Sequence, residues 1–308
     1  MKRWLGLFVV LLTIGLCKST AMAAETKDIV VALGADLSDS QRATVLELMG
    51  LTENDLANCT VLYITNEMEH EYLDSYLGAS VIGSKSLSSV KLTKASAGTG
   101  VVVTTQNINY CTTGMYRNAL MTAGMEDTEV LVVAPTAISG TAGLIGALKA
   151  YEAMSGKTVS DVVLDTSLDE MITTGELAES IKDADSEEVE SLIAWLKGKI
   201  AGGELDTGDE SSVKEIIEEG EELFGVSLTE EEKKQIISLL KKLDSLGLDA
   251  DYLIDQAQKL YEKYGLDLVE NANEAINEAV GNAFTTAVKN FFQGIKTSVS
   301  NFFKSIFS

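Results

Sequence analysis

EVLVVAPTAISGTAGLIGALKAYEAM, residues 129–154, is the stretch that decides the fold class. Its first part, Glu129–Ala134, is rich in branched apolar residues, as a buried strand is. Pro135 is expected to end that strand, because proline has no N–H to give to a sheet. Its second part, Gly140–Met154, begins with small residues and continues as a predicted helix. A buried strand followed directly by a helix indicates a layered fold of strands and helices.

The same alternation continues toward the N-terminus. Short runs of branched and aromatic residues predict strands, and Gly, Asn or Ser residues separate them from segments with helical spacing. Asn66 is expected to cap the helix that follows it. The resulting order, β-α-β-α-β-β-α-β-α, predicts an N-terminal α/β domain with a mixed sheet. The predicted strands are Asp28–Leu33, Thr60–Thr65, Ser88–Thr93 and Gly100–Asn107, and the predicted helices are Ser38–Met49, Glu67–Leu77 and Thr112–Ala123.

Beyond this domain the sequence becomes helical and strongly acidic. Residues 24–164 contain 16 acids and 8 bases, whereas residues 165–270 contain 29 acids and 10 bases. Glu187–Ile200 carries apolar residues on one helical face, Thr229 and Glu232 form a capping box, and Asp249 is expected to cap a helix through Tyr264. We therefore expect an α/β domain over 24–164 and an acidic all-helical domain over 165–270.

The first 23 residues have the pattern of an export signal. Lys2 and Arg3 precede an apolar run from Trp4 to Leu16, and Ala21-Met22-Ala23 offers small residues at a cleavage site. The apolar run is shorter than the roughly 20 residues of a membrane span. We expect residues 1–23 to be removed, and the protein to be secreted and associated with the cell envelope.

Charge and cysteine content limit the classes of partner. The 308-residue chain has a formal net charge of −23, which argues against a nucleic-acid partner, since phosphates require lysine and arginine. Cys59 and Cys111 follow the signal segment, and outside the cytoplasm they could form a disulfide or stay as two buried thiols. Two cysteines and one histidine, without C-x-x-C spacing, make a poor zinc set, so no metal site is expected.

A weak candidate ligand site lies at the start of the helix after the deciding strand. Gly140, Thr141 and Gly143 are positioned to expose backbone amides that bind anions, although close helix–sheet packing also explains small residues there. The spacing is not G-x-G-x-x-G and the lysine of a P-loop is missing, so no cofactor is expected. The single histidine, His70, is interpreted as a surface or structural residue, and no catalytic residue is assigned.

The C-terminal segment, residues 271–308, is predicted to be an amphipathic helix. Its apolar positions fall in an arc of roughly 120° on a helix, with polar residues opposite and with Lys289 and Lys296 at the borders. Burial of one Phe side chain is worth about 1.5–3 kcal/mol, so the stripe should be covered. The stripe consists of Phe284, Val288, Phe291, Phe292, Ile295, Val299, Phe302, Phe303 and Ile306.

Three interpretations of this stripe stay open. It could lie on a membrane surface, pair with a partner helix or a second copy, or pack on the acidic helical domain. The leading hypothesis is a non-enzymatic envelope protein that contacts a membrane surface or an envelope partner through the stripe. The alternative is an enzyme or ligand-binding protein that acts on an envelope component through the α/β domain.

Several stretches of the sequence resemble the YpuA-like family of exported Gram-positive proteins, a domain of unknown function (number 1002). The resemblance implies export and an envelope setting, and it supplies no catalytic residues. An aromatic residue is expected at the position of Cys111 in relatives, so the resemblance does not imply a disulfide. The stretches are LGADLSDSQ (33–41), ITNEMEHEYL (64–73), IGSKSLSSV (82–90), NINYCTTGMYRNALMTAG (107–124), VVAPTAISGTAGLIGALKAYE (132–152) and FGVSLTEEE (224–232).

Overall fold

The fold is that of a computed structural model, which describes residues 28–181, 186–249 and 253. Three sequence predictions lie outside these residues. They are the export signal over 1–23, nearly all of the helix expected from Asp249 to Tyr264, and the amphipathic segment over 271–308.

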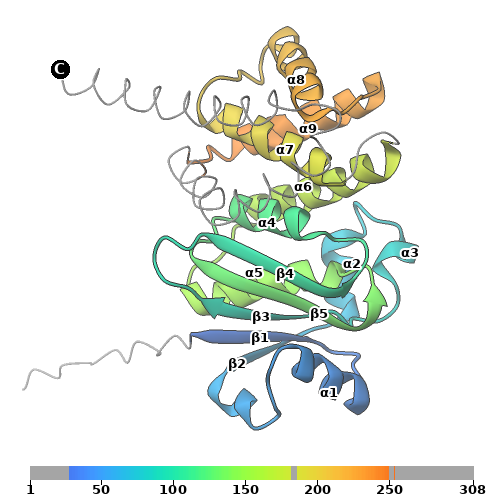
Figure 1. The fold of residues 1–308 in the computed structure, drawn as a ribbon, viewed down its shortest axis with the longest axis vertical. Coiled ribbons are helices and arrows are strands. Elements are labelled where there is room, and N and C mark those ends of the chain that lie inside the picture. The colour runs from blue at the N-terminus through green and yellow to red at the C-terminus, as the bar shows by residue number, and fades with distance from the viewer. Residues whose placement is uncertain (1–27, 182–185, 250–252, 254–308) are drawn as a thin grey trace, which may run out of the picture.

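A five-stranded mixed sheet forms the centre of the molecule (Figure 1). The strand order is β2-β1-β3-β5-β4. β1 pairs in parallel with β2, and β4 with β5, while β3 runs antiparallel to both β1 and β5. Four strands, all except β3, therefore run in the same direction, and their carboxyl ends lie together at one end of the sheet. The strands are β1 (Ile29–Gly34), β2 (Thr60–Ile64), β3 (Ser89–Lys94), β4 (Val101–Ile108) and β5 (Thr128–Ile138).

Helices alternate with these strands in the predicted order, which confirms the expected α/β class. Two short helices, η1 (Asp55–Asn58) and α3 (Ala79–Ile82), add to it. The cap of the second long helix differs from the expected Asn66, because Thr65 Oγ1 accepts the N–H of Met68 at 3.2 Å. The longer helices of this part are α1 (Asp39–Leu48), α2 (Asn66–Leu73), α4 (Thr113–Thr122) and α5 (Thr141–Ser155).

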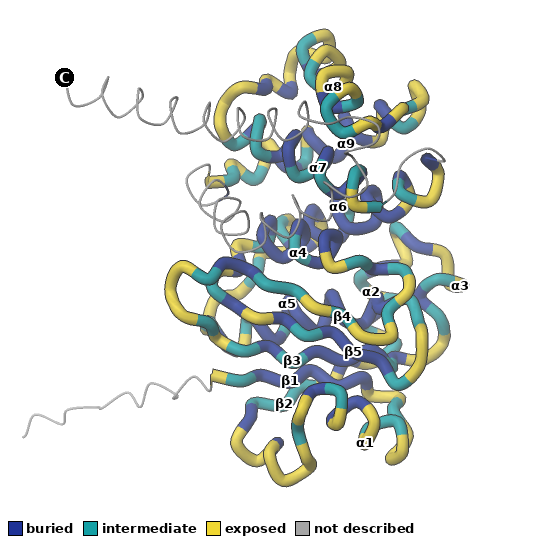
Figure 2. The backbone as a smooth tube through the Cα atoms, viewed as in Figure 1, coloured by how far each residue is buried: buried dark blue, intermediate teal, exposed yellow. Residues whose placement is uncertain are grey.

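Alternation along the strands produces two apolar faces, one on each side of the sheet. In β1, Val30 and Ala32 face the large core under α5 and α4, whereas Val31 and Leu33 face a smaller core under α1 and η1. Figure 2 shows the inner strands buried and the outer loops exposed. The sheet is thus covered on both faces, as a layered α/β fold requires.

β5 is longer than the sequence predicts, and Pro135 does not end it. The strand runs to Ile138, beyond the expected end at Ala134. The regular ladders with β3 and β4 both reach Val133, and the pairing with β4 resumes at Ile138 after an irregularity. Pro135 therefore lies where no ladder pair is recorded, so its missing N–H costs no hydrogen bond there.

After α5, the described residues form helices α6 to α9, which stack at the β4 end of the molecule (Figure 1). The capping box is confirmed: Thr229 Oγ1 accepts the N–H of Glu232, whose side chain accepts the N–H of Thr229. This unit has its own core, built around Leu192, Leu196 and Leu240. The helices are α6 (Asp161–Ser180), α7 (Ser186–Ala201), α8 (Glu210–Phe224) and α9 (Glu230–Ser245).

α6 joins the two units and spans the expected boundary between residues 164 and 165 without a break. Leu168 and Met171 belong to the core of the sheet, whereas Leu177, further along the same helix, belongs to the helical core. One continuous helix therefore contributes to both cores.

Candidate functional site

The ends of the four parallel strands meet a set of loops that hydrogen bonds hold together. After β1, the N–H of Ala35 donates to Ile64 O at 2.8 Å, and the N–H of Asp36 donates to Ser86 O at 3.1 Å. The N–H of Ser86 in turn donates to Asp36 Oδ2 at 2.8 Å. In open α/β sheets, ligands usually bind outside the carboxyl ends of the parallel strands.

The predicted ligand residues Gly140, Thr141 and Gly143 lie at the start of α5, near the carboxyl ends of the parallel strands. All three are buried. Gly140 precedes the helix with a φ of 95°, a backbone conformation that favours glycine. At Gly143, a Cβ atom would lie 2.6 Å from Val132 Cγ1 and 2.8 Å from the Tyr116 hydroxyl oxygen. Close packing therefore accounts for the small residues that the sequence singled out.

A buried carboxylate of the protein itself lies at the start of α5. Thr141 Oγ1 donates to Glu69 Oε2 at 2.9 Å, and Glu69 is 1% exposed. The carboxyl group of Glu69 therefore lies beside the first residue of α5, the end of a helix that favours negative charge. The pKa of Glu69 is raised, mainly by burial, although the hydrogen bond from Thr141 favours its charged form. Among the described residues, Glu69 Oε1 has no hydrogen-bond partner.

Tyr116 and Cys111 complete this polar cluster, which we call the Glu69 cluster (Glu69, Thr141, Ser86, Cys111 and Tyr116). The Tyr116 hydroxyl donates to Gly140 O at 2.6 Å, and the Cys111 N–H donates to Ser139 O at 3.0 Å. Burial raises the pKa of the Cys111 thiol to about 12. A thiol with such a pKa is protonated at neutral pH and is a poor nucleophile.

Sequence reasoning missed Glu69 because its neighbours in sequence are exposed acids. Glu69 lies on the inner face of α2 together with Leu73, one helical turn further on. That i,i+4 relationship with an apolar residue was the available signal. His70 is partly exposed and its Nδ1 lies 2.6 Å from Asp74 Oδ1, which raises its pKa. His70 thus lies partly exposed on α2 and pairs with a neighbour on the same helix, which fits its interpretation as a surface or structural residue.

The two cysteines are free and lie in different cores. Cys59 is buried in the small core under α1, and Cys111 in the large core under α5. The sheet separates these two cores, so the structure has two buried thiols, which is one of the two alternatives that the sequence leaves open.

A second buried polar group, absent from the sequence predictions, lies where the helical unit meets the sheet unit. Lys197 Nζ, on α7, lies 2.7 Å from Glu170 Oε1, on α6, and both side chains are almost fully buried. Lys197 also donates to Asn118 O at 2.9 Å and to Thr122 Oγ1 at 3.0 Å, both on α4. This ion pair therefore links three helices.

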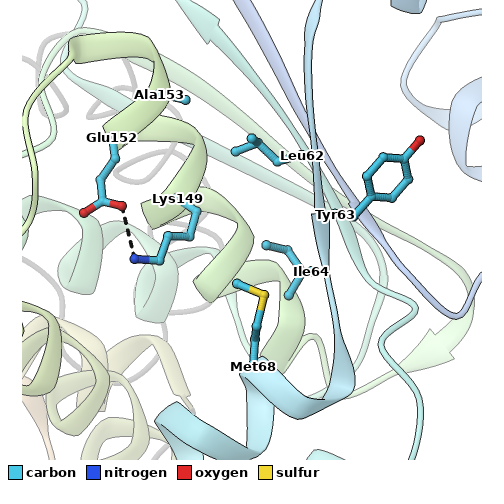
Figure 3. Close-up of a pocket in the computed structure, with 7 residues that line it drawn as sticks. All are labelled: Leu62, Tyr63, Ile64, Met68, Lys149, Glu152 and Ala153. Carbon is cyan, nitrogen blue, oxygen red and sulfur yellow. Dashed lines mark hydrogen bonds and ion pairs between the residues drawn. The ribbon is translucent and has the colours of Figure 1, made fainter.

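An open pocket of about 450 Å³ lies between β2 and α5 (Figure 3). Leu62, Ile64 and Met68 form its apolar floor. Lys149 and Glu152 stand at its rim and pair with each other at 3.1 Å. Tyr63 points away to the opposite face of β2 (Figure 3). The pocket is accessible, whereas the Glu69 cluster is enclosed.

Among residues 28–181, 186–249 and 253, no three His, Cys, Asp or Glu side chains gather where they could hold a metal ion. Within the same residues, no helix combines the length and the apolar character of a membrane span.

The described chain is thus a mixed-sheet α/β unit joined through α6 to an acidic helical unit. Residues 33–260 match the family described as "Protein of unknown function (DUF1002)". The chain is also 34% identical over 304 residues to the uncharacterized protein YpuA of Bacillus subtilis (strain 168), a match that covers 98% of this chain and 99% of that protein. The chain belongs to the DUF1002 family, which confirms the resemblance. No solved structure matches it.

Five of the six stretches that carry the family resemblance contribute residues at the carboxyl ends of the parallel strands or to the Glu69 cluster. They supply Asp36, Glu69, Ser86, Tyr116 and Thr141 to the hydrogen bonds there.

Proposed function

We propose that this protein is an exported, non-enzymatic component of the cell envelope that attaches to a membrane surface through its C-terminal segment, residues 282–307. The pattern of residues 1–23 supports export. The apolar stripe of residues 284–306 supports attachment.

One observation carries this proposal. Among the described residues, the large hydrophobic residues that are exposed to solvent are Tyr63 and Val162. The described body therefore offers little apolar surface to a bilayer, whereas nine apolar positions lie in one stripe of the C-terminal segment. Residues 271–308 also carry 2 acids and 3 bases in an otherwise acidic chain, so this segment is the part least repelled by anionic lipid.

Sedimentation with lipid vesicles tests the proposal. The chain from Ala24 to Ser308 should sediment with phosphatidylglycerol vesicles, and a chain that ends at Gly281 should stay in the supernatant. A sharper comparison uses full-length variants of equal charge. Phe291→Asp with Phe302→Asp places two carboxylates on the stripe, and Asn290→Asp with Asn301→Asp places two on the polar side.

The stripe variant should lose binding, and the polar-side variant should keep most of it. Equal partitioning of the two variants, or of the long and short chains, contradicts membrane attachment. If the protein does not bind vesicles but its C-terminal segment still retains an envelope protein in cells, a partner helix and not the membrane is the binding partner of the segment. A change of mass with concentration in light scattering identifies self-association.

An enzyme or ligand-binding role at Gly140–Gly143 has less support. The groups at the start of α5 are buried, and Glu69 is hydrogen-bonded to Thr141. A substrate would have to displace this carboxylate and open the loops around it.

A further inference from the structure

The two edges of the sheet differ in how they are protected. At one edge, β4 packs against α4, and the helical unit stacks beyond it (Figure 1). β4 also has an irregular register between Gln106 and Ile108, and Asn107 there has a φ of 61°. Irregularities and covering helices are the usual ways in which proteins prevent an edge from pairing with another chain.

At the other edge, β2 has a regular register; it packs against α5 and η1, and an open pocket lies between it and α5. Among the described residues, β2 pairs with β1 alone, and its sequence, TVLYI, contains no charge, proline or glycine. Its residues are mostly half-buried or exposed, whereas five of the six residues of β1 are buried. An uncharged apolar edge strand is a template for an added strand.

The side chains of β2 would give an added strand contacts on both faces. Leu62 and Ile64 border the pocket between β2 and α5, while Tyr63 lies on the opposite face and is 54% exposed (Figure 3). Side chains of an added strand alternate in the same way, so every second residue would enter the pocket or reach Tyr63.

The charges around β2 indicate the kind of strand that fits. The cations beside it are already paired: Arg42 with Glu53, and Lys149 with Glu152. The segments before and after β2 carry further exposed carboxylates, at Asp55, Glu67 and Glu71. The apolar edge therefore has an acidic rim, which disfavours a second copy of this chain and favours a cationic partner.

We propose that the β2 edge binds an extended polypeptide segment with alternating apolar residues flanked by lysine or arginine, which adds as a sixth strand beside β2. The backbone of the segment would pair with β2, its apolar side chains would enter the pocket, and its basic ends would meet the acidic rim. This contact is independent of the C-terminal segment, so the vesicle experiment can fail without affecting it.

The test uses the chain from Ala24 to Ser308 and three fluorescent peptides in anisotropy titrations. The probe alternates valine and threonine between lysine pairs. The second peptide replaces the central valine by proline, which keeps the charge but removes a backbone N–H. The third replaces the lysines by glutamates. We expect the probe to bind, and each of the other two to bind at least about tenfold more weakly.

Two protein variants locate the contact. Leu62→Lys puts a charge on the pocket side of β2, and Thr104→Lys puts the same charge on an exposed position of β4. Leu62→Lys should weaken probe binding about tenfold, and Thr104→Lys should leave it unchanged. If thermal melting shows that Leu62→Lys is unfolded, Glu67→Lys with Glu71→Lys tests the rim instead, with a similar expected loss.

Three results would overturn the proposal. Equal binding of the proline peptide would mean charge attraction without strand pairing. Equal loss with Leu62→Lys and Thr104→Lys would place the contact elsewhere. Self-association of the chain that Leu62→Lys abolishes would make a second copy the occupant of the edge.

Discussion

Thr141 and Glu69 are 72 residues apart in sequence, yet the Thr141 hydroxyl donates to the Glu69 carboxylate at 2.9 Å in the interior of the protein. This bond connects α2, the helix that follows the outer strand β2, to the start of α5. A residue of the protein itself thus hydrogen-bonds to the first residue of the segment that most resembles an anion site, and this contact contributes to the stability of the fold.

Replacement of Glu69 by Gln should change how stability depends on pH. The pKa of Glu69 is raised in the folded protein, chiefly by burial, so the folded state holds its proton more tightly than the unfolded state. Glu69 therefore favours folding at low pH, and this contribution is lost as pH rises from the unfolded pKa through the raised folded one. Urea unfolding of both proteins, at a series of pH values from acidic to neutral, measures the difference.

The expected result is that the variant gains stability relative to the native protein as pH rises. The side-chain oxygen of Gln can still accept the hydrogen bond from the Thr141 hydroxyl, so the comparison isolates the effect of the negative charge of Glu69. A difference that is constant with pH, or that moves in the native protein's favour as pH rises, would contradict the assignment.

Gly143→Ala should destabilise the protein. Its Cβ would lie 2.6 Å from Val132 Cγ1, so the helix or the sheet must shift, and overpacking of this kind costs about 1–3 kcal/mol. Gly78→Ala is the matched control, because its Cβ would meet only the Ser80 hydroxyl oxygen, at 3.8 Å. Denaturant unfolding of both variants should show a loss in the first and little change in the second. Equal losses would show that packing at α5 is not the reason for the glycine.

Lys197 and Glu170 should behave as a coupled pair in a double-mutant cycle. Lys197→Met alone leaves a buried carboxylate without its cation, and such changes cost about 3–5 kcal/mol. Glu170→Gln alone leaves the buried ammonium without its counterion. The double variant should lose less unfolding free energy than the two single variants together, because it leaves no unpaired charge. Additive losses in chemical unfolding would mean that the two groups do not interact energetically.

Local signals predicted much of the fold, and tertiary context decided the rest. The capping box of Thr229 and Glu232 and the alternation of strands and helices depend on near neighbours, and both were predicted correctly. α6 was not predicted, because its buried face includes hydroxyls that bond back along the helix. Thr166, Ser167 and Thr174 each donate to the carbonyl four residues earlier, so no apolar period appears in the sequence.

The sequence located the start of α5 but not the residue that hydrogen-bonds to it. The glycines around Thr141 marked the start of α5 correctly, yet its partner Glu69 comes from a helix far away in sequence. Pairing of Lys197 with Glu170 depends in the same way on how α7 packs on α6. Such long-range contacts leave no periodic pattern in one sequence, whereas caps and strands do.

Thiol labelling separates the two alternatives for the cysteines in solution. Cys59 and Cys111 lie in cores on opposite faces of the sheet, and both are buried. In the folded chain from Ala24 to Ser308, neither should react readily with a water-soluble alkylating agent, because burial keeps reagent out and raises the pKa of Cys111 to about 12. In denaturant, both should react whether or not a reductant is present, and mass spectrometry counts the labels.

Labelling that requires a reductant would mean that the thiols are bonded and that the sheet does not separate them. Cys59→Ser and Cys111→Ser assign the labels, since each variant should lose one and keep the other.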